Sequence, residues 1–103
     1  MKQKTSKLRN LERKRKSILT DNLEKCFICG RTATDLHEIY SGANRKASMI
    51  HDFCCPLCRT CHQAITLDYG LNLRLKRLCQ EKFEETHEHS EFMSIIKKNF
   101  LEN

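Results

Sequence analysis

Apolar residues recur at helical spacing in the last third of the chain. One face of a long helix is marked by Leu71, Leu75, Leu78, Cys79 and Phe83. One face of a second helix, which begins near Ser90, is marked by Phe92, Ile95, Ile96 and Phe100. Residues 62–67 are typical of the first turns of an earlier helix, which residues 68–70 interrupt. Two amphipathic helices are therefore expected to close the domain.

The middle of the chain contains short runs that are typical of strands. Residues 35–40 and residues 52–57 each predict a strand. Residues 41–44, which read Ser-Gly-Ala-Asn, predict a turn between them. A hairpin-like insert followed by helices indicates a small α+β domain.

Two pairs of cysteines flank this insert. The first pair, Cys26 and Cys29, and the second pair, Cys58 and Cys61, both have CxxC spacing, and 28 residues separate them. Two intervening residues let both thiolates of a pair reach one ion, and four thiolates complete the tetrahedral shell of structural zinc. The sequence therefore predicts a zinc staple. The remaining cysteines lack this spacing; they are Cys54, Cys55 and Cys79. We expect them to be small buried hydrophobes, with Cys55 as an alternative metal ligand.

Positive charge is concentrated at the start of the chain. The 103 residues carry a formal net charge of +6, but residues 1–20 hold eight Lys or Arg residues against one acidic residue. We expect residues 1–20 to form a basic flexible or helical arm and residues 21–103 to form the zinc-binding domain. Such an arm either binds nucleic-acid phosphates or serves as a solvated tail; the densest part comprises Arg13, Lys14, Arg15 and Lys16.

Composition narrows the class of protein further. Seven cysteines, an odd number, and the lack of a signal peptide argue for thiolate metal ligands in a reducing compartment, so a cytoplasmic location is expected. No run of eighteen apolar residues occurs, so no membrane insertion is expected. A domain of this size buries little apolar surface, which makes a metal staple useful for stability.

Two histidines occupy positions suited to metal chemistry. His37 falls at the end of the first predicted strand, and His62 directly follows Cys61 at the start of a predicted helix. A hairpin and a helix that each present one histidine can hold a divalent ion against a phosphodiester. These residues could alternatively be partly buried histidines that only form hydrogen bonds.

The chain resembles the HNH, or ββα-metal, endonucleases, particularly the small phage and prophage-type proteins with two CxxC knuckles. The resemblance covers about residues 24–103. It rests on the segments CFICG, LHEIYSGANRK, LCRTCH, QEKF and EFMSIIKKNFL. It implies a zinc-stapled ββα-metal domain with two C-terminal amphipathic helices and a basic N-terminal arm.

The resemblance also implies roles for individual residues. His37 and His62 would be ligands of a catalytic divalent metal (Mg, Mn, Ni or Zn), and Glu38 would occupy the general-base position, where the family usually has histidine. The family's middle asparagine is missing, and Asn44 is the nearest replacement. Arg45 and Lys46 would clamp phosphates, unless they are ordinary exposed charges.

Three functions remain open from the sequence. The first is a phage-related, metal-dependent DNA endonuclease that nicks phosphodiesters in a bacterial host. The second is a catalytically degenerate zinc module that binds nucleic acid or a protein, with inhibition of a host defence nuclease as one form of the protein-binding role. The third is a structural adaptor whose C-terminal helices pack on a partner or a second copy through Phe92, Ile96 and Phe100.

Overall fold

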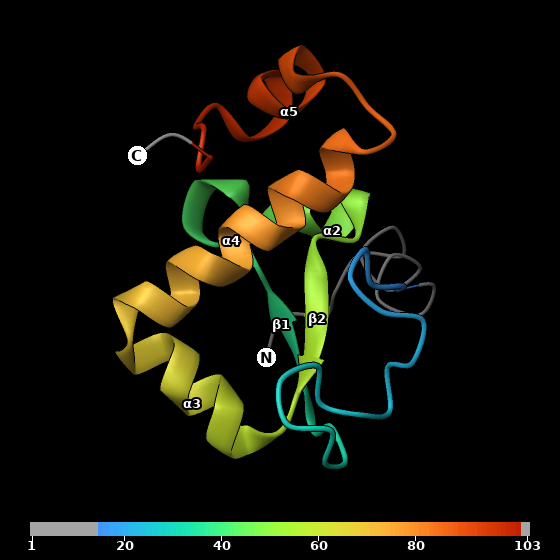
Figure 1. Cartoon of the computed structure of the whole chain (residues 1–103), viewed down its shortest axis with the longest axis vertical. Coiled ribbons are helices and arrows are strands. Elements are labelled where there is room, and N and C mark those ends of the chain that lie inside the picture. Colours follow the sequence, from blue (N-terminus) through green and yellow to red (C-terminus); the bar gives the residue numbers. More distant parts are fainter. Residues whose placement is uncertain (1–14, 102–103) are drawn as a thin grey trace, which may run out of the picture.

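The computed structural model describes residues 15–101 and has the expected α+β class (Figure 1). In this part of the chain a two-stranded antiparallel sheet is combined with four α-helices. The elements in chain order are β1 (Asp35–Glu38), the 3-10 helix η1 (Gly42–Asn44), α2 (Arg45–His51), β2 (Cys54–Leu57), α3 (Arg59–Leu67), α4 (Tyr69–Glu84) and α5 (His89–Ile96). The expectations for Arg13 and Lys14 fall outside the described residues.

The sheet leads directly into the helix that follows it. Asp35 pairs with Leu57 at one end of the register, and Glu38 pairs with Cys54 at the other end. Cys58 then caps α3, because its sulfur accepts a hydrogen bond from the amide of Cys61. Strand, strand and helix therefore follow in the predicted order, and the second CxxC pair joins β2 to α3.

The connection between the strands differs from the prediction. In place of a turn and a strand from residue 52, the chain forms η1 and then α2, and β2 begins at Cys54. Asp52 ends α2 in the left-handed region, with φ at 57°. The buried hydroxyl of Ser48 in α2 donates to the carbonyl of Tyr40 and accepts from its amide. These two bonds satisfy the Ser48 hydroxyl, so this polar residue of α2 can be buried in the interior.

An aromatic cluster forms the centre of the core. The ring of Tyr40 meets Phe53 at a centroid distance of 5.5 Å and Phe92 at 5.7 Å, both in edge-to-face geometry. Figure 1 shows α4 passing the end of the sheet at which α2 lies, with α5 above it. The cluster therefore joins the segment after β1 to α5 and to Phe53, the residue before β2, which holds the strand that carries His37 in place.

The two C-terminal helices are present, with corrections to their faces. Leu75, Cys79 and Phe83 of α4 are buried as predicted, but Leu71 and Leu78 are exposed. The second helix ends at residue 96, because Lys97 adopts the left-handed region. The predicted helical position of Phe100 is therefore wrong, although its side chain is buried in the segment after α5.

The apolar stripe expected to meet a partner lies inside the protein. Phe92, Ile96 and Phe100 all belong to the core cluster of this chain. Their spacing is explained by intramolecular packing. Within residues 15–101, no helix combines the length and apolar character needed to span a bilayer.

Candidate metal centre and histidine pair

The two CxxC pairs converge on one point. The sulfurs of Cys26, Cys29, Cys58 and Cys61 all lie within 4.8 Å of one another, and the Sγ atoms of Cys29 and Cys58 are 3.6 Å apart. An ion held tetrahedrally at the usual zinc–sulfur distance separates its sulfurs by about 3.8 Å. The cluster therefore fits a structural metal such as zinc. No other group in residues 15–101 brings three or more metal-ligating side chains so close together.

The local backbone supports negative charge on this cluster. Although burial opposes it, hydrogen bonds from nearby backbone amides, including those of Cys29 and Ile28, lower the pKa of Cys26 to about 6. The amide of Cys61 likewise lowers the pKa of Cys58. Burial and the neighbouring sulfurs raise the pKa of Cys61 to about 12. Without a bound cation, repulsion between the negatively charged sulfurs disfavours deprotonation of the remaining cysteines. A bound dication offsets this repulsion.

The three remaining cysteines lie apart from this cluster. Cys54, Cys55 and Cys79 are completely buried, and none belongs to the four-sulfur group. Burial raises the pKa of Cys79 and that of Cys55 to about 12. The prediction that these residues behave as small buried hydrophobes is thus consistent with their environment.

The structure brings the two predicted histidines together. The rings of His37, on β1, and His62, on α3, have centroids 5.0 Å apart at an interplanar angle of 64°. The Nδ1 atom of His62 lies 2.8 Å from a carboxylate oxygen of Asp35 and donates to it. In the neutral imidazole this bond places the ring proton on Nδ1 and leaves Nε2 of His62 with a free lone pair. Asp35 and His37 are two positions apart on β1, so they share one face of the strand.

His37 has the electrostatic properties of a neutral ligand. Its Nε2 atom is buried and has no hydrogen-bond partner among the described residues. Burial, together with repulsion from His62 when that ring is protonated and from Lys76, lowers the pKa of His37 to about 4. The imidazole is therefore neutral near pH 7, and a buried polar atom remains available for an ion or a substrate oxygen.

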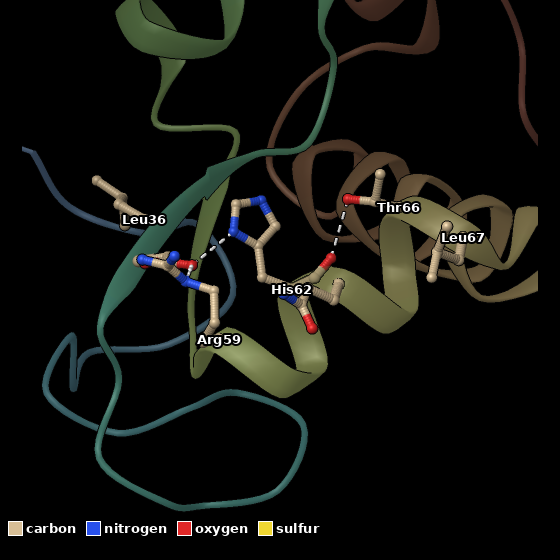
Figure 2. Close-up of a pocket in the computed structure, with 7 residues that line it drawn as sticks. Leu36, Arg59, His62, Thr66 and Leu67 are labelled. Atoms are coloured by element: carbon tan, nitrogen blue, oxygen red, sulfur yellow. Dashed lines mark hydrogen bonds and ion pairs between the residues drawn. The ribbon is translucent and has the colours of Figure 1, made fainter.

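A surface hollow of about 740 Å³ adjoins His62 (Figure 2). Its lining includes Asp35 and Arg59, whose guanidinium forms two bonds of 3.0 Å with that carboxylate. Figure 2 shows the His62 ring turned toward the same carboxylate from α3. Leu36 and Leu67, both exposed, supply an apolar rim. Asp35 and Arg59 were not among the predicted site residues, although the i, i+2 relation of Asp35 to His37 indicates a shared strand face.

Glu38 is not brought to the histidine pair. Its carboxylate forms two hydrogen bonds with the guanidinium of Arg15, one of 2.8 Å. The Arg15 side chain is only 4% exposed, and its Nε atom lies 3.4 Å from Asp52. Strand alternation turns Glu38 to the face opposite His37. Arg15, grouped by sequence with the basic arm, is therefore committed to an internal ion pair.

The other predicted site residues are distributed over different elements. Asn44 donates from Nδ2 to the carbonyl of Ile96 at 3.2 Å, so it joins η1 to the end of α5. Arg45 and Lys46 are exposed on the first turn of α2. Lys16 is also exposed, next to the internal Arg15. No hydrogen bond or ion pair within residues 15–101 links any of these four side chains to His37 or His62.

Comparisons with models of known protein families, with curated proteins and with solved structures each found no match to this chain. The interpretation of the site therefore depends on its own geometry.

Proposed function

We propose that the protein is a metal-dependent DNA endonuclease of the HNH type, with its reaction centre at His37 and His62. The observation that carries this proposal is the meeting of the two imidazoles between β1 and α3. Asp35 orients one of them, and the other has an unpartnered buried nitrogen. A strand and a helix joined by a thiolate cluster give both ligands rigid support.

Each residue has a distinct part in this proposal. His62 and His37 would hold a divalent ion, which when bound would polarise the scissile phosphate and stabilise the departing oxygen. Asp35 accepts the hydrogen bond of Nδ1 in His62 and so aims Nε2 away from the carboxylate, as carboxylates commonly do behind metal-bound histidines. Glu38 neutralises the buried Arg15 and so stabilises the fold. We therefore do not assign Glu38 the role of general base.

Plasmid nicking tests this proposal. Wild type should convert supercoiled plasmid to nicked circle with magnesium, manganese or nickel, and His62→Ala should reduce the rate at least about 100-fold. His37→Ala should have a similar effect, whereas Asp35→Asn should cost about 10- to 100-fold, the usual cost of removing an orienting group. The exposed residue His51 provides the matched control, because His51→Ala should nick normally.

The zinc content of each variant separates loss of the reaction from loss of the fold. Nicking that survives in zinc-loaded His62→Ala would contradict the proposed centre. Wild type that is zinc-loaded and folded but never nicks would overturn the nuclease proposal.

A second candidate function is a zinc module that binds nucleic acid without cleaving it. The ion pair between Glu38 and Arg15 favours it, because the residue in the family's base position is occupied elsewhere. DNA binding that persists when a chelator removes weakly held metal but leaves the thiolate cluster loaded, without nicking under any metal, would support this alternative.

Deletion of residues 1–14 removes most of the basic arm and tests its role in DNA binding. The deletion keeps Ser17, which donates to the carbonyl of Cys54, and Ile18, whose amide donates to the carbonyl of Asp52. The truncated chain should melt like wild type but bind DNA more weakly, with a flatter dependence of affinity on salt. An unchanged salt dependence would show that the arm does not contact DNA.

A further inference from the structure

A pair of lysines surrounds the ring of Phe100. The Nζ atom of Lys76, on α4, lies 5.5 Å from the ring centroid, and that of Lys98 lies 5.3 Å from it. Both distances are within the range of cation–π attraction. Two ammonium groups are thus gathered at one place, although their sequence positions are 22 residues apart.

The segment that carries Lys98 is fixed to α4. Gln80, which is fully buried, accepts a hydrogen bond from the amide of Phe100 and donates to the side chain of Asn99, both at 2.8 Å. Arg77 donates to the carbonyl of Phe100 at 2.8 Å. Asn99 and Phe100, the two residues that follow Lys98, are therefore held to α4 by three hydrogen bonds.

The lysine pair is not neutralised within the described chain. In residues 15–101 no carboxylate oxygen lies within 4.0 Å of either Nζ atom. Burial, followed by repulsion from Lys98, lowers the pKa of Lys76. An unpaired cationic cluster of this kind is stabilised when an anion binds.

The backbone around Lys76 connects it to the strand that bears His37. The hydroxyl of Tyr40, three residues after His37, donates to the carbonyl of Lys76 at 2.7 Å. Tyr40 also contacts Phe100, with ring centroids 5.4 Å apart. Tyr40 and Phe100 therefore connect the lysine pair to the segment that follows the strand of His37.

We propose that Lys76 and Lys98 bind a backbone phosphate of the DNA strand, adjacent to the phosphate presented to His37 and His62. The proposal rests on the proposed function, because it takes its ligand class from the phosphodiester substrate. Lysine binds phosphate as a point charge and reads no base sequence. The pair would therefore position the strand at the reaction centre and would not select a target sequence.

The salt dependence of DNA affinity tests this inference independently of cleavage. Binding of a short fluorescent duplex to the zinc-loaded protein is measured across salt concentrations, with no second metal added. Each lost phosphate contact should reduce the slope of log affinity against log salt by about 0.9. Lys76→Gln and Lys98→Gln should each lower the slope, the double variant should lower it by about 0.9 in total because the pair shares one phosphate, and Lys76→Arg should keep the wild-type slope.

Lys82 provides the matched control on α4. It is exposed and pairs with Glu85 at 3.2 Å, so Lys82→Gln should leave the slope unchanged. Lys98 is exposed as well, so Lys98→Gln remains informative if replacing the partly buried Lys76 disturbs the fold. Unchanged slopes in folded Lys76→Gln and Lys98→Gln, or a wild type that does not bind DNA, would overturn the inference. If these slopes fall although wild type never nicks, the phosphate site stands and the nuclease proposal fails.

Discussion

Replacing Cys26 by serine is expected to unfold the domain and release its metal. The residue is 3% exposed and belongs to the four-sulfur cluster. Binding of structural zinc by small domains is worth about 10–16 kcal/mol in apparent free energy, which equals or exceeds the whole stability of a typical domain. Circular dichroism and metal analysis should show loss of helix and loss of about one zinc per chain.

Cys79→Ala is the matched control for this prediction. Cys79 is equally buried but lies outside the metal cluster, so its replacement removes only packing contacts. We expect a cost of about 1–2 kcal/mol, with zinc content unchanged. A Cys26→Ser protein that stays folded without metal, and melts at the wild-type temperature, would contradict the structural role of the cluster.

Local sequence patterns account for the parts of the fold that depend on short-range spacing. The CxxC pairs predicted the cluster because two intervening residues place both sulfurs on one knuckle, and Gly30 adopts a φ of 79° there. The periodic apolar residues of residues 71–83 predicted α4 because an amphipathic face imposes that period. These features are visible without knowledge of distant residues.

Features that depend on distant contacts could not be predicted in the same way. Helix α2 contains the buried Ser48, whose hydrogen-bond partner, Tyr40, lies on the preceding segment. A serine in a local sequence gives no sign that it will be buried. Arg15 and Glu38 are 23 residues apart, and nothing in either local sequence indicates their pairing. The meeting of His37 and His62 was predicted by the family resemblance, whereas the orienting role of Asp35 required the geometry.

Replacing Glu38 by glutamine is expected to destabilise the fold while leaving the histidine centre intact. The substitution removes the charge that faces Arg15, whose side chain is 4% exposed against 15% for Glu38. Removal of one partner from a buried pair typically costs 3–5 kcal/mol. Asp52, still 3.4 Å from Arg15, compensates in part, so we expect about 3 kcal/mol, or roughly a 15 °C fall in melting temperature.

A double-variant cycle distinguishes this structural role from catalysis. Arg15→Met alone should also destabilise, because it leaves the Glu38 carboxylate without its partner, whereas Arg15→Met combined with Glu38→Met should recover most of the loss. The exposed neighbour Lys16 supplies the control, since Lys16→Met should change stability by less than about 0.5 kcal/mol. Nicking by the folded fraction of Glu38→Gln should match wild type, because the carboxylate faces Arg15 and not His37. A Glu38→Gln protein with wild-type stability and no nicking would assign Glu38 to the reaction and require the strand to present it differently when DNA is bound.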